Sequence, residues 1–164
     1  MNHDDPRQHL IEILKKFDTL MMISDAPDHT FHGRPMAVAE VGPSGELWFA
    51  SSRDSGKVRE VAVNARALVT GQGGGAYVSV SGHLDVVEDR ARVRALWRES
   101  WKVWFPQGKD DPNLVLMRLR PDHGEYWSQE GAAGVRYLFE AAKALITGER
   151  PGTDNPEQHA KVKM

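Results

Sequence analysis

The chain has 164 residues, 40% of them hydrophobic and 27% charged, which predicts one globular domain with a core of its own. Its 21 basic and 23 acidic side chains give a formal net charge of −2, so no basic surface for nucleic acid is predicted. The absence of cysteine excludes disulfide frameworks, thiolate nucleophiles and cysteine zinc sites. No apolar run approaches the roughly 20 residues of a membrane-spanning helix, and residues 1–6 do not resemble a secretory signal. We therefore expect a cytoplasmic protein that binds neither nucleic acid nor a membrane.

Hydrophobic periodicity divides the chain into short strands with a few helices between them. We expect helices at residues 6–17, 57–65, 89–104 and 135–146, and strands at residues 20–24, 35–41, 46–51, 67–70, 77–87, 114–119 and 125–128. Turns are predicted at Gly42–Gly45, at the glycine run 71–75 and at Pro121–Gly124. A glycine inside a strand, Gly82, indicates a bulge or a bend.

This pattern favours a mainly β protein with short helices (α+β), folded as a closed antiparallel barrel. The regular strand–helix alternation of a doubly wound parallel sheet is absent, and closure of a barrel removes exposed strand edges. We expect a single domain over residues 1–146. The tail, residues 147–164, is rich in glycine, proline and charge, and we expect it to be loosely ordered.

The segment Ser51–Lys57 combines hydroxyl groups, a glycine, a lysine and the start of a predicted helix. Free amide groups at a helix start together with a cation favour the binding of a phosphate group. A capped helix with solvated charges fits the same local pattern. Arg34 precedes the strand that pairs with the one ending at Ser51, so Arg34 and Lys57 are predicted to converge on one dianion, although a surface arginine is the alternative.

Several other functional motifs are incomplete in this sequence. A P-loop would need glycine at Ser51 and a hydroxyl residue at Val58, and a dinucleotide fingerprint would need glycine at Ala76. His29 and His32 are three residues apart, but the sequence places no third metal ligand near them. No carboxylate pair or nucleophile elbow is present. Chemistry supplied by a bound cofactor fits this pattern better than catalysis by side chains alone.

Five tryptophans are many for this length, and three of them, Trp97, Trp101 and Trp104, would share one face of a continuous helix. Such a stripe is usually part of a core. Trp104 and Phe105 lie where the helix should end, however, and exposed rings there can border an aromatic ligand or a subunit interface. We expect Trp101 and Trp104 to be exposed on a monomer, which favours dimerisation.

The sequence resembles the flavin-binding general stress proteins (general stress protein 26-like) of the pyridoxamine 5′-phosphate oxidase-like superfamily, which share a split β-barrel. The match runs from about residue 8 to residue 146. Its stretches are Gly33-Arg34-Pro35-Met36, Leu47-Trp48-Phe49-Ala50-Ser51-Ser52, Asp54-Ser55 with Lys57, Tyr77-Val78-Ser79-Val80-Ser81-Gly82, Asp89-Arg90, Leu96-Trp97, Trp104-Phe105-Pro106-Gln107-Gly108, Asp110-Asp111-Pro112 and Glu125-Tyr126-Trp127. Their order and spacing make the resemblance specific.

The resemblance implies FMN bound at a homodimer interface. Arg34, Ser55 and Lys57 match the positions that hold the phosphate, and residues 48–51 match the strand beside the isoalloxazine ring. The second subunit would contribute residues near Trp104. The predicted cofactor-binding residues are Arg34, Pro35, Met36, Trp48, Phe49, Ala50, Ser51, Ser52, Ser55, Lys57, Trp104, Phe105, Gly108 and Trp127.

The function that the resemblance implies is two-electron flavin chemistry on a small molecule that the sequence does not identify. Ser128-Gln129-Glu130-Gly131 stands where the pyridoxal phosphate-forming oxidases have a basic substrate-binding segment, so that activity is not expected. Two alternatives remain open on the same residues: a flavin- or haem-binding sensor or storage protein without turnover, and a reductase that uses deazaflavin F420. FAD in place of FMN is a further alternative.

Overall fold

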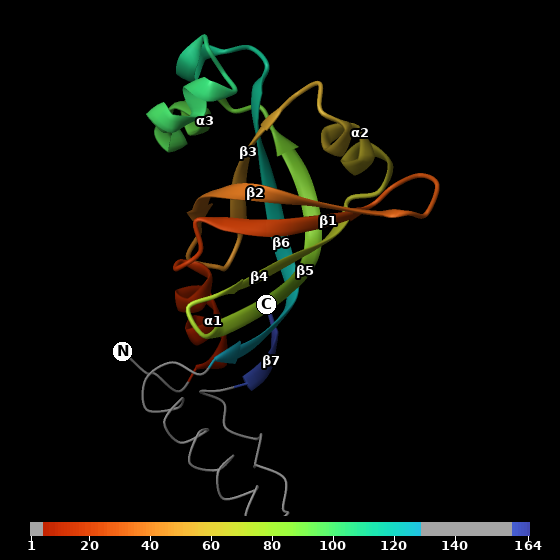
Figure 1. Cartoon of the computed structure of the whole chain (residues 1–164), viewed down its shortest axis with the longest axis vertical. Helices are drawn as coiled ribbons and strands as arrows, with labels where there is room; N and C mark the ends of the chain where they lie inside the picture. The colour runs from red at the N-terminus through yellow and green to blue at the C-terminus, as the bar shows by residue number, and fades with distance from the viewer. Residues whose placement is uncertain (1–4, 129–158) are drawn as a thin grey trace, which may run out of the picture.

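The computed structural model describes residues 5–128 and 159–164 (Figure 1). It begins with helix α1 (Pro6–Leu14). Asp5 caps this helix by accepting a hydrogen bond from the amide of Arg7, and Pro6 fits the first turn because its missing N–H would have no partner there. Leu10, Ile13 and Leu14 are buried in the barrel core, so α1 packs onto the barrel with its apolar face.

The described strands form one antiparallel sheet that closes on itself. They are β1 (Thr19–Asp25), β2 (Phe31–Val41), β3 (Leu47–Ser52), β4 (Arg66–Gly73), β5 (Ala76–Val87), β6 (Leu114–Ser128) and β7 (His159–Lys163). Their order is β3-β2-β1-β4-β5-β6-β7, and an additional pairing of β3 with β6 joins β1 to β6 into a barrel. The predicted antiparallel barrel is confirmed. Short turns connect β1 to β2, β2 to β3 and β4 to β5. The turn between β4 and β5 consists of Gly74 and Gly75, both at positive φ.

Strand β6 is longer than predicted and replaces two expected strands. Its first half pairs with β3, its second half pairs with β7, and β5 runs along its other edge. The predicted turn at Pro121–Gly124 is wrong, because Pro121 lies in the ladder opposite Gly82. The β5–β6 register shifts between Ser81 and Gly82, which confirms the predicted bulge and accommodates a residue without an N–H group.

A small lobe stands at one end of the barrel (Figure 1). It consists of α3 (Arg90–Leu96) and two 3₁₀ turns, η1 (Glu99–Val103) and η2 (Gly108–Asp110). The single helix predicted over residues 89–104 is wrong. Trp97 is extended (ψ 136°), and the guanidinium of Arg98 donates to the carbonyl of Ala39, which fixes this break against β2.

The break changes the environment of the tryptophans. Trp97 and Trp101 meet edge to face, with ring centroids 5.8 Å apart, rather than sharing one helix face. Trp101 is buried in a second hydrophobic cluster with Val93, Phe105 and Leu114, so its predicted exposure is also wrong. Trp104 is exposed as predicted.

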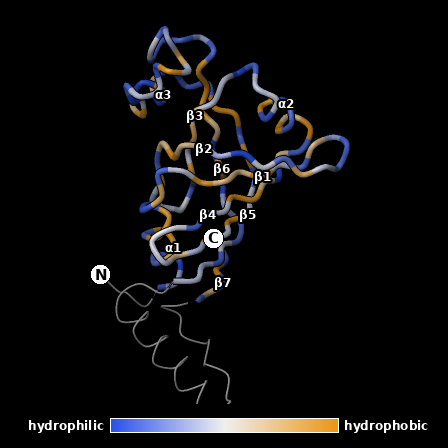
Figure 2. The backbone as a smooth tube through the Cα atoms, in the orientation of Figure 1, coloured by the Kyte–Doolittle hydropathy of each residue, from blue (hydrophilic) through white to orange (hydrophobic). Residues whose placement is uncertain are grey.

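The end of the chain adds a strand to the sheet. His159–Lys163 forms β7, although we expected a loosely ordered tail from residue 147. The predicted helix at residues 135–146 lies outside the described residues. Among the helices that the structure describes, none is long and apolar enough to cross a membrane. Figure 2 shows that the β1–β2 hairpin tip is hydrophilic and extends away from the barrel.

Candidate functional site

The predicted phosphate segment lies where β3 leaves the barrel and helix α2 (Gly56–Val63) begins. The end of β3 is tied to the lobe side of the barrel, because the amide of Arg53 donates to the carbonyl of Asn113, 2.8 Å away. Ser55 is the N-cap residue of α2, but its side chain makes no capping hydrogen bond. The first amide groups of α2 are therefore left with donor capacity for another acceptor.

Two hydroxyl groups from the predicted set meet at this corner. The Oγ atoms of Ser51 and Ser55 are 3.3 Å apart. Ser52 is turned toward the lobe, where its Oγ accepts a hydrogen bond from the side chain of Asn113 at 2.7 Å. The structure thus places Ser51 and Ser55 side by side, while Ser52 supports the loop instead.

Arg34 reaches α2 from β2, but by a different route from the one predicted. Its strand partner is Met22 of β1, and β2 pairs with β3 only over Val38–Val41. A register shift between Val38 and Glu40 interrupts that pairing. Arg34 therefore does not face Ser51 across the ladder; its side chain extends to α2 and contacts Glu60.

The structure brings the two predicted cations close together. Burial lowers the pKa of Lys57, the nearby charge of Arg34 lowers it further, and the charge of Glu60 acts in the opposite direction. Glu60, which contacts Arg34, lies three residues after Lys57 on α2, so Lys57 and Arg34 lie in the same region. The alternative of an isolated surface arginine does not fit, because the Arg34 side chain is only 21% exposed.

Glu60 is the residue of this region that sequence reasoning missed. Its Oε2 accepts hydrogen bonds from Nη2 of Arg34 at 2.9 Å and from Oγ of Ser24 at 2.6 Å, and its Oε1 lies 2.9 Å from Nδ1 of His32. Burial raises the pKa of Glu60, but these hydrogen bonds and the charge of Arg34 outweigh burial and bring it to about 2. The three-residue spacing from Lys57, which places both side chains on one helix face, was the available signal.

The residues present fit a phosphate group. The Nη1 atom of Arg34 is buried and has no hydrogen-bond partner among the described residues. A buried donor of this kind is costly unless it receives an acceptor. The guanidinium of Arg34, the ammonium of Lys57 and the uncapped start of α2 together suit an acceptor with several oxygens and a double negative charge.

The aromatic residues of β3 point into the two hydrophobic cores. Phe49 is buried inside the barrel, whereas Trp48 is buried beneath the lobe. The guanidinium carbons of Arg92 and Arg118 lie 4.7 and 5.4 Å from the centre of the Trp48 ring. Neither ring is free to stack on a planar ligand, so a ligand beside β3 would meet its backbone and the small side chain of Ala50.

The other predicted residues are spread over the molecule. Met36 is buried in the barrel core and Pro35 is exposed on β2. Phe105 is buried in the lobe, and Gly108 takes a positive φ of 78° at the start of η2. Trp127 lies near the far end of β6, where it stacks on His159 with ring centroids 5.2 Å apart. The lobe and β7 lie at opposite ends of the barrel, so one chain does not unite these aromatic residues at one site (Figure 1).

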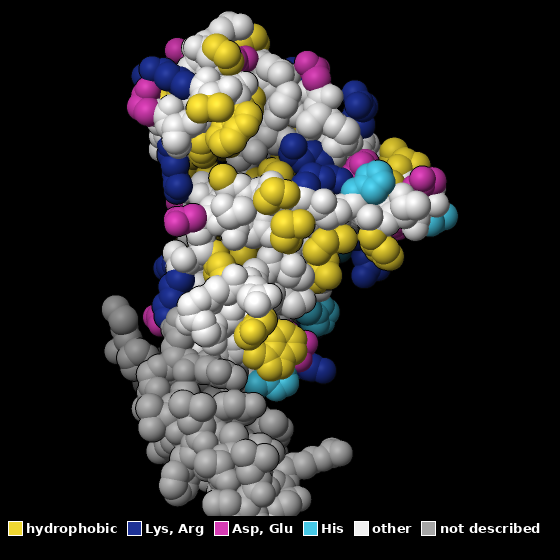
Figure 3. Space-filling model, viewed as in Figure 1, with side chains coloured by type: hydrophobic (Ala, Val, Ile, Leu, Met, Phe, Trp, Pro, Cys, Tyr) yellow, Lys and Arg dark blue, Asp and Glu magenta, His cyan; other side chains and the backbone are white. Residues whose placement is uncertain are grey.

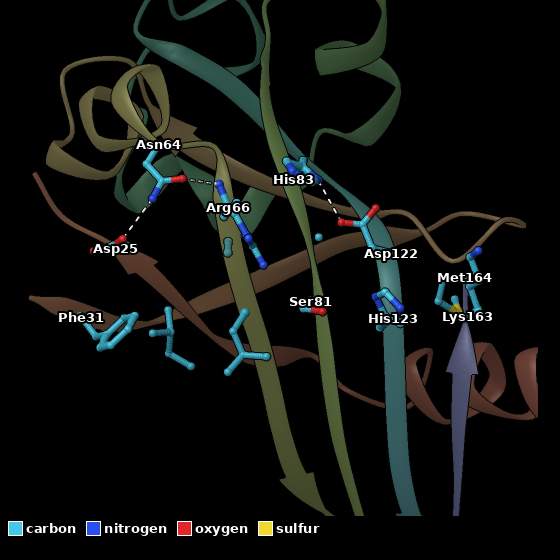
Figure 4. A pocket seen from close by; sticks show the side chains of 14 residues that line it. Asp25, Phe31, Asn64, Arg66, Ser81, His83, Asp122, His123, Lys163 and Met164 are labelled. Atoms are coloured by element: carbon cyan, nitrogen blue, oxygen red, sulfur yellow. Dashed lines mark hydrogen bonds and ion pairs between the residues drawn. The ribbon is translucent and has the colours of Figure 1, made fainter. Parts of the chain in front are cut away.

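A cavity of about 1140 Å³ lies on the outer face of the sheet and does not include the phosphate residues. Figure 4 shows side chains from β4, β5 and β6 converging on it, with His83 paired to Asp122 at 2.9 Å. Ile23 and Asp25 of β1 line it, while Ser24 between them points to Glu60. Because strand side chains alternate between faces, the cavity and the phosphate residues lie on opposite faces of β1.

The family described as "Pyridoxamine 5'-phosphate oxidase like" matches residues 5–152. The chain belongs to the pyridoxamine 5′-phosphate oxidase-like family.

The proteins that this chain resembles include general stress proteins. The chain is 26% identical over 129 residues to General stress protein 26 of Bacillus subtilis (strain 168), covering 74% of this chain and 88% of that protein. A crystal structure of a candidate general stress protein 26 from Jannaschia sp. CCS1 has a TM-score of 0.74 and 25% identity, and covers 96% and 97% of the two chains. The general stress FMN/FAD binding protein from Xanthomonas citri has a TM-score of 0.65 and 30% identity, and covers 77% and 90%.

Proposed function

We propose that this chain is a flavin-binding general stress protein that holds FMN by its phosphate at the start of α2. The observation that carries the proposal is the buried, unpartnered Nη1 of Arg34 beside Lys57 and the uncapped helix start. The name of the Xanthomonas citri relative, which includes FMN/FAD binding, supports a flavin as the ligand. Bound flavin would supply two-electron redox chemistry on a small molecule, and the chain would supply binding and orientation.

In this proposal each residue of the corner has a definite task. Arg34 and Lys57 neutralise the phosphate charge, and Ser51 and Ser55 offer hydroxyl donors next to the helix amides. The backbone of β3 lies beside the ring system, because Phe49 and Trp48 are committed to the two cores. Glu60, the carboxylate that contacts Arg34, is engaged in ion pairs with Arg34 and His32 rather than in an acid–base pair, which supports a cofactor-based activity.

The substrate is proposed to differ from that of the pyridoxal phosphate-forming oxidases. After Trp127 the sequence continues Ser128-Gln129-Glu130-Gly131, which lacks the arginine and histidine pair expected for a phosphorylated pyridine substrate. We therefore place the protein among flavin-dependent oxidoreductases acting on another small molecule.

We further propose that two copies of the chain assemble to complete the flavin site. Large apolar side chains are exposed on the outer face of β1, β4, β5 and β6 and on the lobe, and Figure 3 shows hydrophobic side chains gathered on one face. They are Met21, Leu68, Tyr77, Trp127 and, on the lobe, Val103 and Trp104. Large apolar side chains exposed on one face are typical of a protein–protein interface, and a partner chain would bring its lobe aromatics to the flavin ring that one chain leaves uncovered.

The affinity for added FMN tests the assignment. In the Arg34→Gln/Lys57→Gln variant, the binding free energy of FMN should become less favourable by several kcal/mol, because each charge-assisted contact contributes roughly 1.5–3 kcal/mol. Flavin fluorescence quenching during a titration measures it. Arg59→Gln is the matched control: it removes a cation from an exposed position on α2, and its affinity should stay within about twofold of wild type. Equal affinity of the double variant and the wild type would contradict the proposal.

A further inference from the structure

Glu60 connects three elements around the proposed phosphate site. It lies on α2, it is 13% exposed, and it contacts Ser24 of β1 and both His32 and Arg34 of β2. A carboxylate this close to a phosphate would be expected to repel it. Its three polar contacts call for a reason other than the charge of the ligand.

The contacts of Arg34 supply that reason, because the two ends of its guanidinium are in different situations. Nη2 donates to Glu60 at 2.9 Å and to Ser24 at 3.1 Å. Nη1 is buried and has no partner in the described part of the chain. Glu60 and Ser24 therefore hold one end of a planar, forked donor group and leave the other end for an incoming acceptor.

Building on the proposed function, we infer that Glu60 is the positioning residue of the phosphate site: it holds Nη2 of Arg34 so that Nη1 is presented to the phosphate beside Lys57. In this role Glu60 acts through Arg34 and does not contact the ligand. Glu60 also favours the charged form of Lys57, whose pKa burial and Arg34 lower. Holding Arg34 in place and keeping Lys57 charged both favour the binding of a dianion. They oppose the direct repulsion between the carboxylate and the phosphate.

Two rival roles for Glu60 make different predictions. If Glu60 only repelled the ligand, every variant that removes its charge would bind FMN more tightly. If Glu60 only tied α2 to the β1–β2 ribbon, its loss would weaken binding by the same factor whether or not Arg34 is present. A positioning role requires that the effect of Glu60 depend on Arg34, and that a neutral side chain with an acceptor oxygen replace it.

The first measurement does not depend on FMN. In ¹⁵N spectra of the full-length protein, the two Nη groups of Arg34, assigned by their loss in Arg34→Gln, should give separate resonances because rotation of the held guanidinium is slow. They should stay separate in Glu60→Gln and merge in Glu60→Ala. Separate resonances in Glu60→Ala would overturn the inference, whether or not the protein binds FMN.

The second measurement is a double-mutant cycle on FMN affinity. Glu60→Ala should weaken binding about tenfold or more, and Glu60→Gln should stay within about threefold of wild type. In the Arg34→Gln background, Glu60→Ala should change affinity by less than about twofold. Asp54→Ala is the matched control, because it removes an exposed negative charge beside the helix start, and Asp54 makes no hydrogen bond or ion pair with Arg34.

The outcomes separate the inference from the proposed function. If Glu60→Ala, Glu60→Gln and Asp54→Ala all bind FMN more tightly than the wild type, Glu60 acts only by charge repulsion. That outcome would overturn the inference. Equal weakening by Glu60→Ala with and without Arg34 would also overturn it, in favour of a purely structural contact. Absence of FMN binding by the wild type would contradict the proposed function, and the Arg34 resonances would then decide the positioning role alone.

Discussion

At the scale of single residues, the candidate site depends on a balance of charges that is built from three side chains. Arg34 and Lys57 bring two positive charges into a partly buried corner, and Glu60 brings one negative charge. The corner keeps a net positive charge, and it keeps Arg34 in place without a ligand. This arrangement explains how two cations remain close together in the folded chain.

The pH dependence of stability should report Glu60. Its pKa is about 2 in the folded chain against 4.5 for the free side chain. A carboxyl with a lowered pKa contributes stability above the unfolded value and loses it as the pH falls toward the folded value. Denaturant unfolding should therefore show the wild type losing stability between about pH 4.5 and about pH 2, and Glu60→Gln losing less over that range. Parallel curves for the two proteins would contradict this.

At the residue scale the sequence predicted the cations and missed the acid. Arg34, Ser55 and Lys57 could be predicted from the sequence, because a cation near a helix start is a local pattern that matches a family motif. The contact of Glu60 with Ser24 and His32 joins residues that are 36 and 28 positions apart. Such a contact depends on how the β1–β2 ribbon packs on α2, which periodicity does not reveal.

At the scale of elements, the barrel depends on a bend in the β5–β6 pair at Gly82. Gly82 lies opposite Pro121 at the register shift, and a Cβ atom on Gly82 would overlap the carbonyl oxygen of Arg120. The backbones of the two strands therefore approach more closely than any residue with a side chain would allow.

Gly82→Ala should accordingly lower the free energy of unfolding by about 1–3 kcal/mol, since the backbone must move to relieve the overlap. Urea unfolding followed by circular dichroism measures it. Gly33→Ala is the matched control in β2, because a Cβ atom there meets side-chain atoms at 3.6 Å, an ordinary contact. A loss at Gly82 no larger than at Gly33 would show that the close approach is not rigid.

Element boundaries were predicted well where local chemistry fixes them and poorly where distant contacts do. The turns at Gly42–Gly45 and Gly74–Gly75 follow from residues that adopt positive φ. The break at Trp97 depends on Arg98 reaching Ala39, and the continuity of β6 through Pro121 depends on Gly82. Strand β7 was missed because its partner, β6, is far away in the sequence.

At the scale of the whole molecule, the exposed apolar face is the feature that a single chain leaves unexplained. It extends over β1, β4, β5 and β6, on the side of the sheet that carries the cavity of about 1140 Å³. The sequence prediction rested on Trp101 and Trp104; the structure buries Trp101 and adds the sheet face instead. The proposal of a dimer now rests on that face together with Trp104.

Leu68→Glu should shift the protein from dimer to monomer, because a carboxylate at the centre of an apolar interface loses its water without gaining a partner. Light scattering at micromolar concentration measures the mass. Val63→Glu is the matched control: Val63 is 70% exposed on α2 rather than on the sheet, and the variant should remain a dimer. A wild-type protein that is already monomeric under these conditions would contradict the proposed assembly.

The visible absorption spectrum of the purified full-length protein, followed by mass analysis of whatever heat releases from it, shows whether the chain binds FMN. We expect a yellow protein with the spectrum of oxidised flavin, the mass of FMN in the released fraction, and loss of the colour in Arg34→Gln/Lys57→Gln. A colourless preparation that takes up no added FMN would contradict it. Release of haem, or tighter binding of deazaflavin F420 than of FMN, would contradict it equally.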